Sequence, residues 1–177
     1  MTTTTQFAFA FDPSRCGGCM ACVVACLDQN DMPGNGSTFR HVTKIERGAY
    51  PATSIQYVSL ACMHCGEAPC ITVCPTRAIS KRADNGVVVV DRDSCIGCHV
   101  CATACPFGAP QFPEGTLMRK CDFCVTRVVE GLEPACVRTC PTKALSFGPI
   151  AKLTAERAKK ASNVIVSSFG TSIVNAL

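Results

Sequence analysis

The sequence has 177 residues, a mass of 18.7 kDa, a formal net charge of +4, no tryptophan and 16 cysteines. This length suits one compact domain or two small ones. Lys and Arg are scattered and form no basic stripe with aromatic residues, which argues against a nucleic-acid-binding protein.

The first predicted element is an apolar-rich strand at residues 6–11, directly before the first group of cysteines. This group has the spacing CxxCxxCxxxC and consists of Cys16, Cys19, Cys22 and Cys26. Residues 21–26, which lead into the last cysteine of the group, suit one or two helical turns. The cysteine-free residues 27–61 follow, and they include two predicted strands, 39–45 and 55–60.

Three further groups follow, and each ends in CxxxCP. The second group widens one gap and consists of Cys62, Cys65, Cys70 and Cys74. The third repeats the spacing of the first and consists of Cys95, Cys98, Cys101 and Cys105. The fourth widens the same gap much further and consists of Cys121, Cys124, Cys136 and Cys140. The four groups therefore form an internal repeat. The gap between the second and third cysteines varies in length, which indicates a loop insertion.

Two more strand predictions lie between and after these groups. Residues 78–81 and 87–90 form a predicted hairpin, because Asn85 and Gly86 between them both tolerate positive φ. Residues 144–147, after the last group, form a strand that is the natural counterpart of residues 6–11.

The spacing of the cysteines points to iron–sulfur ligation. A CxxCxxC run places three thiolates around one 4Fe-4S cluster, and the fourth cysteine, before proline, ligates a second cluster. Groups therefore work in pairs, and 16 cysteines match four 4Fe-4S clusters with no ligand left over. Residues 1–11 lack the features of a signal peptide, so we expect a cytoplasmic protein without a disulfide framework.

Two other functions are compatible with a cysteine-rich protein. A structural zinc-binding interaction module also uses CxxC pairs, but it gives no reason for the third cysteine or for CxxxCP. A free-standing polyferredoxin that shuttles electrons between enzymes would use the same cysteines. The sequence has no GxGxxG, GxxxxGK or GxSxG motif, so we expect no catalytic site of its own.

Four segments carry a resemblance to a known family: CGGCMACVVAC, CMHCGEAPCITVCPTRAI, CIGCHVCATACPFGAP and KCDFCVTRVVEGLEPACVRTCPTKAL. Over residues 7–149 the sequence resembles the four-cluster iron–sulfur subunits of the molybdopterin and tungstopterin oxidoreductases, such as dimethyl sulfoxide reductase and formate dehydrogenase. It also resembles the electron-transfer subunits of soluble tungsten aldehyde oxidoreductase-type complexes. The resemblance implies a non-catalytic subunit that relays single electrons between a tungsten or molybdenum pterin catalytic subunit and a redox partner.

The resemblance also implies a fold and a ligand set. The fold would be α+β, with two pseudo-symmetric ferredoxin-like subdomains in residues 1–149 that join the first group to the fourth and the second to the third. One pair of clusters would be held by Cys16, Cys19, Cys22 and Cys140, and by Cys26, Cys121, Cys124 and Cys136. The other pair would be held by Cys62, Cys65, Cys70 and Cys105, and by Cys74, Cys95, Cys98 and Cys101. Leu27 departs from the pattern, because proline follows the other three groups.

Three polar residues near the cysteines are weaker candidates for a functional role. His64 lies inside CMHC, and we expect it beside a cluster or at the surface, since every cluster already has four cysteines. Arg119 and Lys120 precede Cys121 and are expected in a solvated turn. The alternative is that they raise the potential of a cluster or bind an acidic partner.

Residues 150–177 form a C-terminal extension with a predicted helix, capped by Thr154 and interrupted at Ser162 or Asn163. After Lys160 the extension is uncharged, and its strongly apolar residues are Val164, Ile165, Val166, Phe169, Ile173 and Val174. We expect it to dock on a catalytic subunit, a further redox subunit or a second copy of the protein, with packing against its own domain as the alternative. No run of apolar residues in the sequence is long enough for a membrane span.

Overall fold

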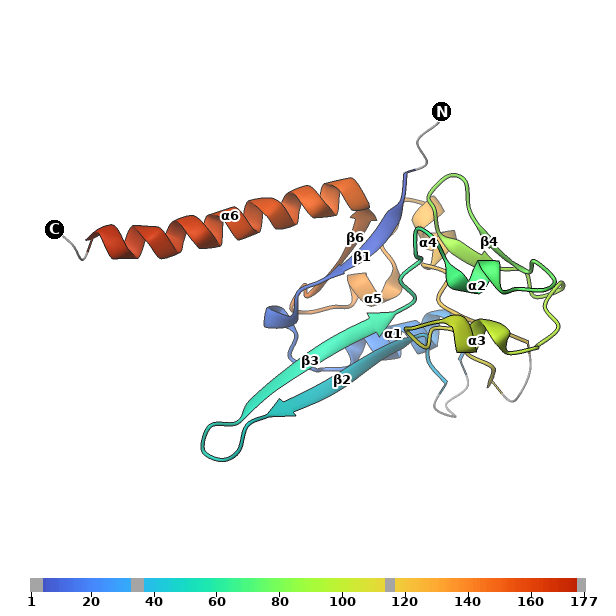
Figure 1. Ribbon diagram of the computed structural model, residues 1–177, viewed down its shortest axis with the longest axis horizontal. Coiled ribbons are helices and arrows are strands. Elements are labelled where there is room, and N and C mark those ends of the chain that lie inside the picture. The colour runs from blue at the N-terminus through green and yellow to red at the C-terminus, as the bar shows by residue number, and fades with distance from the viewer. Residues whose placement is uncertain (1–4, 33–36, 114–116, 175–177) are drawn as a thin grey trace.

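The computed structural model describes residues 5–32, 37–113 and 117–174, and within them three two-stranded antiparallel sheets accompany short helices and one long helix (Figure 1). The strands are β1 Phe7–Phe11, β2 Arg40–Arg47, β3 Ser54–Ala61, β4 Ile79–Lys81, β5 Val88–Val90 and β6 Leu145–Pro149. The helices are the 3-10 turn η1 Pro13–Arg15, then α1 Ala21–Gln29, α2 Pro69–Thr72, α3 Val100–Ala104, α4 Val125–Val129, α5 Ala135–Arg138 and α6 Ile150–Val174.

The β1–β6 sheet joins the two ends of the cysteine-bearing part of the sequence. The strands are antiparallel, with Phe7 opposite Pro149 and Phe11 opposite Leu145. The prediction that residues 6–11 and 144–147 are counterparts is therefore confirmed. The pairing places Cys16, which follows β1, in the same packed cluster as Cys140, which precedes β6.

The β4–β5 hairpin also forms where the sequence predicts it. The side-chain Oδ1 of Asn85 accepts a hydrogen bond from the Val87 amide at 3.0 Å. Gly86 has a φ of +69°, and a Cβ atom there would lie 2.5 Å from the side-chain oxygen of Gln6. The left-handed backbone at this position therefore favours glycine, and the flexible end of the Gln6 side chain occupies the space beside it.

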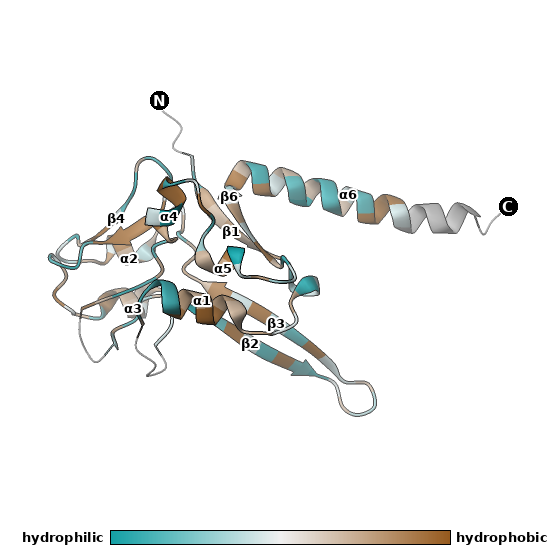
Figure 2. Cartoon of the chain, turned by 180° about the vertical axis from the view of Figure 1, so that it is seen from behind, coloured by the Kyte–Doolittle hydropathy of each residue, from teal (hydrophilic) through white to brown (hydrophobic). Residues whose placement is uncertain are grey.

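The β2–β3 hairpin is a long arm that projects from the body of the molecule (Figure 1). Its strands confirm the two predicted in residues 39–45 and 55–60, with Arg40 opposite Ala61 and Arg47 opposite Ser54. Polar and apolar residues are interspersed along both strands, as Figure 2 shows. The arm is buried only at its base, where Phe39 and Arg40 are 4% and 2% exposed.

Proline controls the lengths of the helices that carry cysteines. In the second, third and fourth groups, α2, α3 and α5 end before the cysteine that precedes a proline. Proline supplies no amide donor and its ring clashes with the preceding turn. Leu27 occupies this place in the first group, and α1 therefore continues past Cys26 to Gln29.

The long helix α6 corrects two points of the predicted extension. It begins at Ile150, directly after β6, so that Thr154 lies inside the helix and donates its hydroxyl to the Ile150 carbonyl oxygen at 2.8 Å. It also continues through Ser162 and Asn163, because these residues lower helix propensity by only about 0.5 kcal/mol each. The side chains of Phe169, Ile173 and Val174 lie outside the described part of the structure.

The first turns of α6 rest against the β1–β6 sheet, and the rest extends away from the body (Figure 1). Leu153 is buried, Arg157 donates to the Phe11 carbonyl oxygen, and Lys160 forms an ion pair with Asp12. No helix in the described ranges has both the length and the apolar character to cross a membrane.

Each of the three clusters of buried residues contains cysteines. One cluster of buried residues centres on Cys22, Cys136 and Cys140, and a second contains Cys70 and Cys101. A third cluster joins residues of all four cysteine groups: Cys26, Cys62 and Cys121, with the partly buried Cys105 packed against them. The division into two pseudo-symmetric subdomains and the boundary at residue 149 stay predictions.

Candidate iron–sulfur sites

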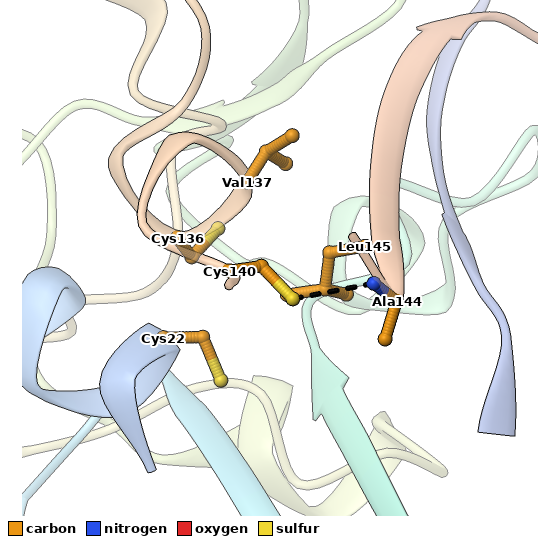
Figure 3. Packing of buried hydrophobic residues seen from close by; sticks show 6 residues of the cluster. All are labelled: Cys22, Cys136, Val137, Cys140, Ala144 and Leu145. Atoms are coloured by element: carbon orange, nitrogen blue, oxygen red, sulfur yellow. Dashed lines mark hydrogen bonds between the residues drawn. The ribbon is translucent and has the colours of Figure 1, made fainter. Parts of the chain in front are cut away.

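A hollow beside the β1–β6 sheet is lined by four cysteines from two distant parts of the sequence. They are Cys16, Cys19, Cys22 and Cys140, and we call this space the Cys140 hollow. Figure 3 shows the sulfur atoms of Cys22 and Cys140 pointing the same way, whereas that of Cys136 points away from them. Three thiols of one group and one thiol of another thus surround a common space.

Two further hollows show the same composition. The Cys105 hollow is lined by Cys62, Cys65, Cys70 and Cys105, together with Lys120. The Cys74 hollow is lined by Cys74, Cys95, Cys98 and Cys101. In each case, three cysteines come from one group and the fourth comes from the group that the resemblance pairs with it.

The remaining four cysteines lie close together in the interior. Burial raises the pKa of Cys26 to about 12, and the neighbouring thiols of Cys136 and Cys124 add to this rise. Burial also raises the pKa of Cys121 well above its usual value, and Cys26 is among the groups that add to this shift. We call these four residues the Cys26 set. Ionisation of thiols buried in this way is costly in free energy, so the thiolates are stable only when a metal centre neutralises their charge.

The backbone after the last cysteine of a group directs hydrogen bonds at its sulfur. The amide of Ala144 donates to Cys140 Sγ at 3.3 Å (Figure 3), in a turn where Lys143 has a φ of +51°. Arg77 has the same place after Cys74, with a φ of +55°. Burial opposes ionisation of Cys74 and Cys140, but hydrogen bonds from nearby hydroxyl and backbone groups outweigh it and lower the pKa of both thiols.

A second backbone feature recurs in all four groups. The residue before the second cysteine has a positive φ in every case: Gly18, His64, Gly97 and Phe123, at +71°, +46°, +67° and +68°. This left-handed residue turns the CxxC segment so that both cysteines face one hollow. Glycine makes the turn without strain, whereas His64 and Phe123 are held in it by packing, since both are at most 1% exposed.

His64 is therefore in the interior rather than at the surface. Its Nδ1 accepts a hydrogen bond from the Val88 amide at 3.0 Å, which fixes the loop of the second group to β5. Burial, and after it the charge of Lys120, lower the pKa of His64 to about 3. The imidazole is neutral at physiological pH.

The expectation of a solvated turn at Arg119 and Lys120 is wrong. Lys120 is only 5% exposed and donates to the carbonyl oxygens of Val88 and Cys121. Arg119 donates to the Asn30 carbonyl oxygen at 2.6 Å and lies over the ring of Phe39. Both side chains turn inward because backbone carbonyls of other elements accept from them.

Two residues that sequence reasoning missed are Arg40 and Ser59, at the buried base of the β2–β3 arm. Arg40 Nη1 donates to Ser59 Oγ at 3.1 Å, and Ser59 Oγ lies 3.6 Å from Cys22 Sγ. No signal in the sequence marks them, because an isolated arginine or serine in a strand is normally a residue that faces solvent.

The cysteine side chains fit 4Fe-4S clusters as a donor set. Thiolates are the ligands that iron–sulfur clusters take, and each needs four. Among the residues that the structure describes, no three His, Cys, Asp or Glu side chains converge on the position of a single metal ion. The hollows instead separate their thiols around a larger common space.

Comparison with known proteins bears on these sites. Residues 15–78 and 53–150 each match a family model described as a 4Fe-4S dicluster domain. An anaerobic dimethyl sulfoxide reductase polypeptide of Escherichia coli K12 is 45% identical over 159 residues, which cover 85% of this protein and 77% of that one. The thiosulfate reductase electron transfer subunit of Salmonella typhi is 45% identical over 148 residues, covering 82% and 77%. A sulfite dehydrogenase subunit of Allochromatium vinosum is 40% identical over 167 residues, covering 82% and 70%.

Proposed function

Since the protein belongs to the 4Fe-4S dicluster family of oxidoreductase electron-transfer subunits, we propose that it connects a pterin-dependent catalytic subunit to a second redox partner. The protein is a non-catalytic subunit that carries four 4Fe-4S clusters. These clusters supply one-electron transfer when bound. The catalytic subunit would carry a tungsten or molybdenum pterin, and the likeness of this protein to the dimethyl sulfoxide reductase polypeptide supports this assignment.

The assignment of ligands to clusters is a further part of this proposal. The observation that carries it is that each of three hollows is lined by three cysteines of one group and one of another. On this basis Cys16, Cys19, Cys22 and Cys140 hold one cluster, and Cys26, Cys121, Cys124 and Cys136 hold its partner. Cys62, Cys65, Cys70 and Cys105 hold the third, and Cys74, Cys95, Cys98 and Cys101 hold the fourth.

Exposure suggests where electrons enter and leave. Cys19, in the Cys140 hollow, and Cys98, in the Cys74 hollow, are the exposed cysteines of the protein. The Cys26 set and the Cys105 hollow contribute Cys26, Cys62 and Cys121 to one buried cluster of residues. The proposed path therefore runs from one exposed end to the other through the two inner sites.

We assign the docking of the catalytic subunit to helix α6. Val164 and Val166 on this helix are 60% and 69% exposed, and a groove of about 1180 Å³ lies between α6 and the β1–β6 sheet. Exposed apolar side chains beside a groove are typical of protein interfaces. We also propose a cytoplasmic location, because the 16 cysteines have to stay reduced until iron and sulfide bind them.

Metal analysis of the anaerobically purified protein tests the central claim. We expect about 16 irons and about 16 acid-labile sulfides per molecule, with reduction by dyes and no substrate turnover. A colourless protein with about four zinc ions would contradict it and favour the zinc module. Co-purification with a pterin enzyme is expected, whereas a stable free protein that passes electrons between separate enzymes would favour the polyferredoxin.

A further inference from the structure

Arg40 is a cation in an unusual position. It is 2% exposed, and no Asp or Glu in the described ranges forms an ion pair with it. Removal of a guanidinium group from water costs on the order of several kcal/mol. An arginine that is buried without a carboxylate therefore needs another source of negative charge nearby.

The surroundings of Arg40 direct its charge toward cysteines. Its guanidinium carbon lies 4.8 Å from the centroid of the Phe9 ring, and its Nη1 donates to Ser59. Its Nη2 is buried and has no hydrogen-bond partner in the described structure. A cluster bound by neighbouring cysteine thiolates would supply the negative charge that balances this group.

The packing around Arg40 identifies those neighbours as two different sets of cysteines. The Phe9 ring beneath its guanidinium packs against the buried cluster that contains Cys22 and also against the one that contains Cys26 and Cys121. Cys22 lines the Cys140 hollow, whereas Cys26 and Cys121 belong to the Cys26 set. Arg40 thus lies beside both sites formed by the first and fourth groups.

Ser59 extends the contact to only one of these sites. Its hydroxyl oxygen accepts from Arg40, so its hydrogen is available to donate elsewhere. Cys22 Sγ, which is an acceptor as a thiolate ligand, lies 3.6 Å from this oxygen. The series of donors therefore runs from Arg40 through Ser59 to the sulfur of Cys22, and Ser59 itself is 4% exposed.

We propose that Arg40 and Ser59 are positioning residues that raise the reduction potentials of the clusters in the first and fourth groups: Arg40 acts on both, and Ser59 acts on the one ligated by Cys22. The reason is that reduction adds one negative charge to a cluster, and a buried cation or a hydrogen bond to a ligand sulfur stabilises that charge. This inference rests on the ligand assignment proposed above.

Potentiometric titration of the holoprotein, monitored by electron paramagnetic resonance, tests the inference. Ser59→Ala should lower the potential of one cluster, so that its reduced-to-oxidised ratio at a fixed potential falls about tenfold, or about 59 mV for a one-electron couple. Arg40→Gln should lower the potentials of two clusters. Arg40→Lys keeps the charge and should shift them less than Arg40→Gln.

Matched controls are available on exposed strands. Ser80→Ala on β4 and Arg47→Gln at the far end of β2 alter the same residue types at exposed positions, and should leave all four potentials unchanged. A structural role alone would reduce cluster content without moving one selected potential. If Arg40→Gln does not assemble its clusters, the potentials measured for Ser59→Ala and Arg40→Lys still test the proposal.

Iron and sulfide are counted in the same samples, which separates the two proposals. A wild-type protein without about 16 irons would overturn the proposed function itself. A fully loaded Ser59→Ala protein whose four potentials equal those of the wild type would overturn only the role of Arg40 and Ser59. Equal shifts of all four potentials would overturn it as well.

Discussion

His64 and Phe123 occupy equivalent positions in the second and fourth cysteine groups, and their rings meet edge to face with centroids 5.2 Å apart. Both residues have positive φ, and both precede the second cysteine of their group. Phe123 also contacts the rings of Phe7, Phe9 and Phe147 on the β1–β6 sheet. The contact between His64 and Phe123 therefore joins the β1–β6 sheet to the loop of the second cysteine group, which His64 fixes to β5.

Phe123→Ala should destabilise the protein by about 3 to 5 kcal/mol, because it empties a fully buried site at this junction. The measurement is the rate at which cluster absorbance is lost in urea with an iron chelator under anaerobic conditions. Tyr50→Ala is the control, since Tyr50 is 94% exposed. Equal rates for the two variants would show that Phe123 does not hold the junction together.

Cys140→Ser should damage the cluster held by Cys16, Cys19 and Cys22 and leave the Cys26 set less affected. The reason is that Cys140 lines the hollow of the first group rather than that of its own group. Cys136→Ser, in the preceding helix α5, is the matched variant and should damage the Cys26 set instead. Electron paramagnetic resonance of the four clusters distinguishes the outcomes. Loss of the same cluster in both variants would refute the cross-ligation.

Asp12→Asn should free helix α6 from the β1–β6 sheet and speed tryptic cleavage after Arg157 and Lys160. The hydrogen bond from Lys160, followed by that from Ser14, lowers the pKa of Asp12 from 3.8 to about 2. Because the carboxyl pKa is lowered, the contribution of the Asp12 contacts to stability is complete above pH 3.8 and is lost as the pH falls toward 2. The contact is therefore intact at neutral pH, where added salt should weaken it. Asp28→Asn is the control, and unchanged cleavage in Asp12→Asn would argue against this anchor.

Deletion of residues 163–177 should leave the clusters and their spectra intact and weaken assembly with the catalytic subunit. The physical reason is that the removed part of α6 extends from the body and exposes Val164 and Val166. Mass photometry of the complex measures the effect, and Val24→Ala, an exposed position on α1, is the control. Loss of the clusters with assembly unchanged would mean that this segment supports the domain itself. Loss of a homodimer instead would identify a second copy of the protein as the occupant.

Local sequence signals predict the strands well, because their causes are local. Gly86 specifies a turn through its positive φ, and Asn85 does so through the hydrogen bond that its side chain accepts from the Val87 amide. The cysteine spacing likewise indicates the number and kind of clusters, since it reflects how a short backbone segment wraps around one of them.

The buried cations cannot be predicted in this way. Lys120 is adjacent to a cysteine in the sequence, but its burial depends on the carbonyl oxygen of Val88, which is 32 residues away. Arg40 depends in the same manner on Ser59 from the other strand of its hairpin. The predicted interruption of α6 at Ser162 or Asn163 is wrong for a different reason, because two weak helix formers do not outweigh the favourable residues around them.

The pairing of β1 with β6 sets an order for the synthesis of the protein. Residues 7–11 leave the ribosome early, but they have no partner strand until residues 145–149 have been made. The β4–β5 hairpin is available much sooner, once residue 90 has emerged. The part of the molecule that contains the second and third cysteine groups can therefore fold while the first cysteines still wait for Cys140. During this interval the nascent polypeptide carries unligated thiols in its first group, and the Cys140 hollow is complete for a cluster only after Cys140 has been made.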